Sequence, residues 1–208
     1  RGVAVAPFMN QSGSQHVDPL AVADLFYSEV QMVRGFKVLP VNRSLQAMVA
    51  LKMETLRGPE DLIRLAEFLD ADLIFAGAVT AYDPYDPPEV GLAVQLYATS
   101  ADKARALNPT ALERSGRPFP IEASLDAGDP RTPRAGVNDI YNAAHDIVQK
   151  QVREFAEVRG AEQSPLRWQL YTKSITHFMR FCCHRAIVAI LDRERQRLLW
   201  QRGSDPDP

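Results

Sequence analysis

The chain has 208 residues, of which 46% are apolar, enough to bury the core of one domain with or without a helical extension. Its 24 basic and 26 acidic residues give a net charge of −2. This balance excludes the strong positive field of proteins that bind nucleic acid or anionic membranes mainly by charge. The two cysteines, Cys182 and Cys183, are adjacent, so we expect no disulfide framework. No apolar run reaches the roughly 18 residues of a membrane-spanning helix.

The first 82 residues alternate between two patterns. Near-continuous apolar runs, typical of strands covered on both faces, are separated by segments in which apolar residues recur at helical spacing. Each predicted helix has a start signal, such as a cap residue followed by proline. In chain order, the sequence predicts a strand at residues 2–8, a helix from Asp18, a strand at 36–41, a helix from Asn42, a helix from Gly58 and a strand at 71–82. This order predicts βαβ units, in which a parallel sheet lies between helices.

A second part of the sheet is predicted after a proline-rich turn at residues 82–88. Residues 91–99 resume strand character, and the simplest interpretation is an antiparallel return of the preceding strand. The sheet is then mixed. Residues 100–135 are rich in proline, glycine, alanine and charge, which predicts a long loop with at most a brief strand at 119–123.

Two long helices are predicted at the carboxy-terminal end. Asn138 caps the first, and the second starts at Ser164 and runs to about Trp200. The predicted fold class is therefore α/β (α+β): a three-layer-like mixed sheet built from βαβ units, with an antiparallel return strand and two carboxy-terminal helices. We expect a sheet domain over residues 1–135 and a helical pair over residues 136–208 that packs on the same domain.

Histidines and cysteines of the last helix suggest a metal site only at first inspection. His177 and His184 lie near Cys182 and Cys183, but seven residues separate the histidines, and zinc or copper needs three or four converging ligands. Buried thiols beside imidazoles at the helix surface are the expected arrangement. The adjacent cysteines also lack the Cys-x-x-Cys spacing of a redox pair.

Other motifs of catalysis or ligand binding are incomplete. The first loop has neither a Gly-x-Gly-x-x-Gly pattern nor a Walker A lysine, and the acidic residues of the turn lack a calcium-loop pattern. His16 and its neighbouring serines have no partner signature, and the chain has no Gly-x-Ser-x-Gly motif. We therefore predict no catalytic, cofactor-binding or metal-binding residues, no cofactor, and a protein that is not an enzyme.

Aromatic and proline residues in the turn after the third strand predict a surface for a protein partner. Tyr82, Tyr85, Pro87 and Pro88 would form a rigid, partly apolar surface there. A loop packed on its own domain is the alternative interpretation. Trp200, which follows an arginine-rich segment, is a further candidate, with a solvated helix end as its alternative.

Three blocks in the first half of the chain resemble a known group of proteins. Residues 3–10 resemble its opening strand and Asn turn, residues 22–44 resemble its helix, strand and Arg-Ser helix start, and residues 65–80 resemble its third strand. The group is the set of bacterial envelope proteins related to the TolB amino-terminal domain, with the curli secretion lipoprotein CsgG and the peptidoglycan-synthase activator LpoB. The matching motifs are structural, so they indicate fold more directly than function.

The resemblance implies a non-enzymatic scaffold or assembly factor of the cell envelope, at the periplasmic face of the outer membrane. Its partners would be other envelope proteins or copies of itself, without nucleic acid, and it would contact the membrane only through a lipid anchor upstream of residue 1. A secretion pore is not expected, because residues 101–117 lack the alternation of membrane hairpins. The alternative is a regulatory domain that binds a small molecule or nucleotide at the carboxyl ends of the strands.

Overall fold

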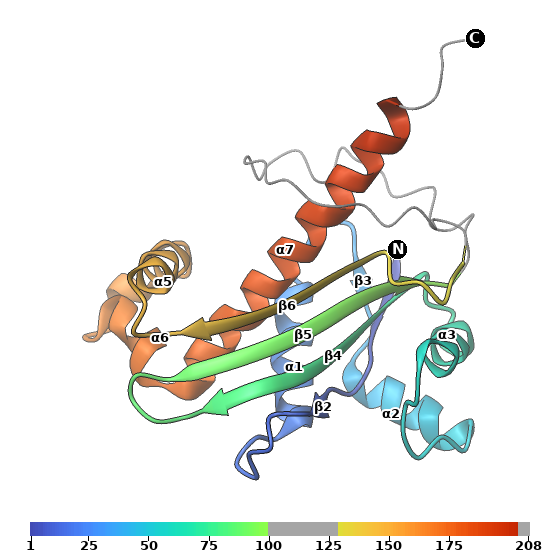
Figure 1. Ribbon diagram of the computed structural model, residues 1–208, viewed down its shortest axis with the longest axis horizontal. Helices are drawn as coiled ribbons and strands as arrows, with labels where there is room; N and C mark the ends of the chain where they lie inside the picture. The colour runs from blue at the N-terminus through green and yellow to red at the C-terminus, as the bar shows by residue number, and fades with distance from the viewer. Residues whose placement is uncertain (100–128, 204–208) are drawn as a thin grey trace.

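The computed structural model describes residues 1–99 and 129–203 (Figure 1). In this part of the chain, six strands form one mixed sheet in the order β3–β1–β4–β5–β6, and β2 also pairs with β4. The pairs β1–β3, β1–β4 and β2–β4 are parallel, whereas β5 is antiparallel to both β4 and β6. The strands are β1 (Gly2–Val5), β2 (Met9–Asn10), β3 (Lys37–Val38), β4 (Leu73–Asp83), β5 (Glu89–Ala98) and β6 (Ala135–Asn142).

Helices lie between and after these strands. They are α1 (Pro19–Val30), α2 (Val41–Ala50), α3 (Pro59–Phe68), α5 (Asp146–Val158), α6 (Leu170–Lys173) and α7 (Ile175–Gly203), with the 3-10 turns η2 (Ala161–Gln163) and η3 (Arg167–Gln169) between α5 and α6. The predicted α/β class, the mixed sheet and the antiparallel return of β5 on β4 are confirmed. None of the described helices is both long and apolar enough to cross a membrane.

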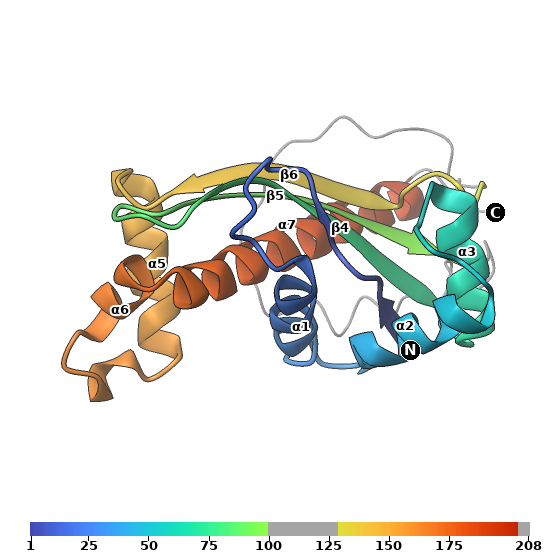
Figure 2. The same ribbon diagram turned by 90° about the horizontal axis from the view of Figure 1, so that it is seen from below.

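The two faces of the sheet are covered by different helices. Leu73 and Phe75 of β4 belong to the core that β1, β5 and β6 form with α1, α5 and α7. Ile74, which points to the opposite face, packs with residues of α2 and α3. This alternation follows from the pleat of a strand, which turns successive side chains to opposite faces. The long helix α7 runs along the sheet beneath β5 and β6 (Figure 2).

Local sequence signals coincide with some element boundaries and differ from others. Asp18 is the N-cap of α1, and its Oδ1 accepts hydrogen bonds from the N–H groups of Leu20 (2.9 Å) and Ala21 (3.2 Å). The next helix starts slightly earlier than predicted, with Pro40 instead of Asn42 as its N-cap. Of the run at residues 2–8, only β1 (Gly2–Val5) is a strand. Pro7, which has no N–H to donate, separates it from β2, which begins after the run at Met9.

Two predictions for the carboxy-terminal part are wrong. Asn138 does not cap a helix: it lies in β6, and α5 begins at Asp146. The second helix is not continuous from Ser164, because Ser174 has extended backbone angles (φ −118°, ψ 117°) that separate α6 from α7. The brief strand predicted at 119–123 lies outside the described residues.

Candidate functional site

The structure places the residues predicted as an interaction surface at separate positions. Tyr82 is half-buried near the end of β4, on the side of the helices, whereas Tyr85 is 75% exposed in the turn between β4 and β5. Pro87 is exposed and Pro88 is buried. Trp200 belongs to the last turns of α7, and both views show this end of α7 at the opposite end of the molecule from the β4–β5 turn (Figures 1 and 2).

Several contacts hold the β4–β5 turn in place. The N–H of Tyr85 donates to Oδ1 of Asp83 (3.0 Å), and Asp86 forms an ion pair with Lys173 of α6. The carbonyl oxygen of Pro88 accepts a hydrogen bond from the N–H of Ala143 (2.9 Å), just after β6. The exposed ring of Tyr85 is therefore carried by a turn that is tied to its surroundings.

Strand β6 forms one edge of the sheet. It pairs with β5 along its whole length, from Asn142 opposite Glu89 to Ala135 opposite Leu96, and no described strand pairs with its other side. The bond from Ala143 to Pro88 fixes the alternation: odd-numbered residues of β6 direct their N–H and C=O groups to β5, and even-numbered residues direct theirs outward. Gly136, Asn138 and Ile140 therefore present backbone groups at the free edge, which we call the β6 edge.

Side chains on this strand are also accessible. Asn138, Asp139 and Ile140 are exposed, and the apolar side chain of Ile140 is 63% exposed. Val137 and Tyr141, which point to α7, are buried. The β6 edge thus combines a firmly packed inner face with a row of outward backbone donors and acceptors to which no described strand is paired.

His184, one of the two histidines considered above as metal ligands, lies beside the buried carboxylate of Glu29 on α1. The Glu29 side chain is 1% exposed and forms an ion pair with Arg159, and its carboxylate oxygens also lie 3.5 Å from His184 Nδ1 and 3.8 Å from Arg180 Nε. The His184 ring packs on Phe155 at 4.8 Å between centroids. These contacts join α1 to α5 and α7.

The two cysteines and His177, the other histidine of this helix, have different surroundings from one another. Cys182 and Cys183 are fully buried, as expected from the sequence, and burial raises the pKa of both thiols. His177 Nδ1 lies 3.0 Å from the Oγ of Ser174. Among the described residues, no group of three His, Cys, Asp or Glu side chains is arranged to hold a metal ion.

A second buried carboxylate, Glu194, lies further along α7. It accepts hydrogen bonds from the guanidinium groups of Arg134 (2.9 Å) and Arg197 (2.8 Å). Burial raises the pKa of Glu194 to about 7, although Arg134 lowers it. This pair fixes the segment before β6 to α7.

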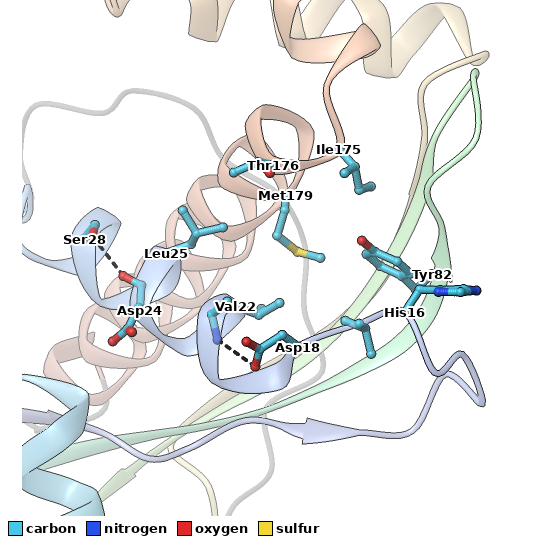
Figure 3. A pocket seen from close by; sticks show the side chains of 12 residues that line it. His16, Asp18, Val22, Asp24, Leu25, Ser28, Tyr82, Ile175, Thr176 and Met179 are labelled. Atoms are coloured by element: carbon cyan, nitrogen blue, oxygen red, sulfur yellow. Dashed lines mark hydrogen bonds between the residues drawn. The ribbon is translucent and has the colours of Figure 1, made fainter.

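One groove lies beside Tyr82, near the carboxyl end of β4, and has a volume of about 420 Å³ (Figure 3). Its walls come from the segment before α1, from α1 itself, from β4 and from the first turns of α7. The lining residues are His16, Val17, Asp18, Ala21, Val22, Asp24, Leu25, Ser28, Tyr82, Ile175, Thr176 and Met179. Burial raises the pKa of the Tyr82 hydroxyl, so it remains a neutral hydrogen-bond donor. The sequence pointed to Tyr82, but not to the residues of α1 and α7 that complete the groove.

Comparison with known proteins identifies no family. No family model matches the chain, and no curated protein matches it. Solved structures with a similar fold include the LpoB C-terminal domain from Salmonella enterica, with 13% identity over 47% of this chain and 71% of that chain and a TM-score of 0.39.

Two other similar structures cover more of the chain. Lipoprotein GNA1162 from Neisseria meningitidis has 13% identity over 79% of this chain and 98% of that chain, with a TM-score of 0.43. The hypothetical protein CT253 from Chlamydia trachomatis has 9% identity over 95% of this chain and 99% of that chain, with a TM-score of 0.47. LpoB belongs to the group whose fold the motifs in the first half of the chain lead us to expect. Because all three TM-scores are below 0.5, these likenesses decide nothing about what the chain does.

Proposed function

We propose that this chain is a non-enzymatic scaffold or assembly domain of the bacterial cell envelope, located at the periplasmic face of the outer membrane as part of a lipoprotein. It acts by binding another envelope protein, or a second copy of itself, along the β6 edge. The observation that carries this proposal is the β6 edge, whose outward N–H and C=O groups pair with no described strand and could therefore pair with an added one.

The two outer edges of the sheet differ in a way that supports this function. Unpaired edges are usually protected by short strands, lysine, proline or bulges, because they otherwise pair with other chains. The edge at β3 is only 2 residues long and contains the exposed Lys37. The β6 edge is 8 residues long and has one charged residue, Asp139, with neither lysine nor proline. The protection present at β3 is therefore weak at β6.

The β4–β5 turn extends this surface. The bond between Ala143 and Pro88 holds the turn beside the end of β6, so Tyr85 and Ile140 belong to the same end of the sheet. Exposed aromatic side chains on rigid supports are typical anchors of protein interfaces. A strand added to β6 would bring its neighbouring residues toward this aromatic ring.

Site-specific photocrosslinking in bacterial cells tests the proposal. A photoreactive residue at Ile140 should give an adduct that mass spectrometry identifies as an envelope protein or as a second copy of this chain. The same residue at Val49, which is more exposed than Ile140 (78% against 63%) but lies on α2, is the control. Equal adducts from both positions, or adducts only with proteins from outside the envelope, would contradict the proposal.

A proline pair separates loss of binding from loss of folding. Asn138→Pro removes an outward N–H and leaves the bonds to β5 intact, so it should abolish the adduct with little change in melting temperature. Asp139→Pro removes an N–H that points to β5 and should lower the melting temperature. An adduct that persists in folded Asn138→Pro would exclude strand addition at β6.

The alternative function, binding of a small regulatory molecule or nucleotide at the carboxyl ends of the strands, would use the groove beside Tyr82. The groove lining contains Asp18 and Asp24 but neither lysine nor arginine. Phosphate groups are normally bound by cations and N–H donors. The lining therefore does not favour a nucleotide.

A further inference from the structure

The groove between α1 and α7 is lined mainly by apolar side chains. Val17, Val22 and Met179 are buried at its walls, and Leu25 and Ile175 are partly buried around them. Figure 3 shows Val22 and Leu25 of α1 on one side of the groove and Ile175 and Met179 of α7 on the other. Its volume of about 420 Å³ is within the range of about 300–1,000 Å³ typical of ligand sites.

The charged groups around the groove are acidic. Asp18 and Asp24 are both exposed, and His16 is the remaining titratable side chain besides Tyr82 among the lining residues. Asp18 uses Oδ1 to cap α1. The backbone oxygen of Asp24 accepts a hydrogen bond from the hydroxyl of Ser28 (2.9 Å), and among the described residues the Asp24 carboxylate has no hydrogen bond or ion pair.

The positive ends of α1 and α7 reduce this charge without reversing it, because both helices begin at the groove. Ile175 and Thr176 form the first turn of α7, where a helix carries roughly half a positive charge. The N-terminus of α1, which Asp18 caps, adds a similar partial charge, and the two carboxylates still exceed the sum of both helix ends. An occupant therefore meets an apolar floor beside negative charge, with the Tyr82 hydroxyl as a neutral donor.

We infer that this groove docks a basic, apolar segment of a partner protein, in which large apolar side chains enter the groove and a lysine or arginine lies beside Asp24. Charge complementarity argues for the basic segment, since the acidic rim would repel an acidic one. The exposed residues His16, Ala21 and Asp24 leave the groove open to solvent, which suits a chain segment better than an enclosed small molecule. This site is separate from the β6 edge.

Binding of short fluorescent peptides tests the inference. Three peptides are compared: one of leucine and lysine, one of serine and lysine, and one of leucine and glutamate. Fluorescence anisotropy at physiological salt should show binding of the leucine–lysine peptide that is at least about tenfold tighter than that of the other two. Equal binding of the serine–lysine peptide would mean attraction by charge alone and would overturn the inference.

Variants locate the binding to the groove. Asp24→Lys should weaken binding of the leucine–lysine peptide about tenfold, because it reverses the charge of the rim. Glu67→Lys is the matched control: it makes the same reversal of charge at an exposed position of α3, on the other face of the sheet, and should leave the affinity within about twofold. Equal effects of the two variants would exclude the groove.

A second variant fills the space without changing charge. Ala21 is exposed on α1 at the groove, so Ala21→Trp should keep the fold and abolish peptide binding. Unchanged binding in this variant would also refute the inference. Asn138→Pro should not change the affinity for the leucine–lysine peptide. Peptide binding without crosslinking at Ile140 would retain the groove and reject the β6 proposal, and the reverse result would reject the groove alone.

Discussion

Glu29 joins three helices through a charge that is almost completely removed from water. It forms an ion pair with Arg159 and lies close to His184 and Arg180. Removing one partner of a fully buried pair costs about 3–5 kcal/mol. Because Arg159 and Arg180 retain contact with solvent, we expect Glu29→Ala to lower the free energy of unfolding by about 2–3 kcal/mol, measured by urea denaturation.

The matched variant is Arg180→Ala. The Arg180 side chain is 43% exposed and its distance to Glu29 is 3.8 Å, so its loss should cost less than about 1 kcal/mol. If both variants destabilise the protein equally, the burial of Glu29 is not what makes its charge important.

Glu194 makes stability depend on pH near neutrality. Burial raises the pKa of this carboxyl from its ordinary value of 4.5 to about 7. Between these values the folded chain holds a proton that the unfolded chain has released, so the stabilisation is complete below pH 4.5 and is lost as the pH rises through 7. The melting temperature of the parent relative to Glu194→Gln should therefore fall by about 3 °C or more between pH 5 and pH 8. A constant difference over this range, followed by circular dichroism, would show that the pKa of Glu194 is not raised.

At the scale of elements, the contact between β4 and β5 depends on one glycine. The register shifts between Val79 and Ala81, which places Thr80 as an extra residue opposite the partner strand. A Cβ at Gly91 would lie 2.5 Å from Thr80 Oγ1 and 2.8 Å from the backbone N of Ala81. Gly91→Ala should therefore destabilise the protein by about 1–3 kcal/mol.

Gly136→Ala on β6 is the control for this substitution. There the nearest atoms to a new Cβ are at 3.4 and 3.5 Å, which is ordinary contact, so the melting temperature should change little. Equal destabilisation by both alanines would point to the general cost of changing glycine in this sheet and not to the bulge.

The elements that could be predicted are those whose local pattern has one interpretation. Strands β4 and β5 are apolar runs of 11 and 10 residues bounded by a proline-rich turn, and both were predicted, as was the antiparallel pairing between them. In contrast, β6 is an edge strand with one polar face, so its buried residues are few: Ala135, Val137 and Tyr141. Ile140 and the apolar residues that follow also fit helical spacing, and pairing with β5 decides the outcome.

The candidate site, too, could be predicted from the sequence only where a local pattern marks its residues. Tyr85 and Tyr82 were predicted as surface residues from the turn that contains them, and the structure places one at the exposed tip and the other in the groove. Asp24 and Met179 carry no motif, because their proximity depends on how α1 and α7 pack. The free edge of β6 could not be predicted before β6 itself was recognised as a strand.

In the molecule as a whole, α7 connects the groove, the sheet and the segment before β6. Its first turns line the groove, its middle packs on β5 and β6, and its last turns extend beyond the sheet (Figure 1). In the part of α7 that precedes Glu194, the side chains of Phe178, Phe181 and Ile190 are fully buried. In the part of α7 from Glu194 onward, among the described residues, Glu194 is the buried residue that joins α7 to the segment before β6.

Hydrogen exchange should divide α7 into these two parts. Amides between Phe178 and Ile190 should exchange only through global unfolding, because the core surrounds this segment. Amides after Glu194 should exchange at least about tenfold faster, through local opening of the helix end. Glu194→Ala should accelerate exchange further in the second part alone, as measured by mass spectrometry of peptic fragments. Equal acceleration along the whole helix would mean that α7 opens as one unit, and that the Arg134 contact stabilises the groove and the β6 edge together with the end of the helix.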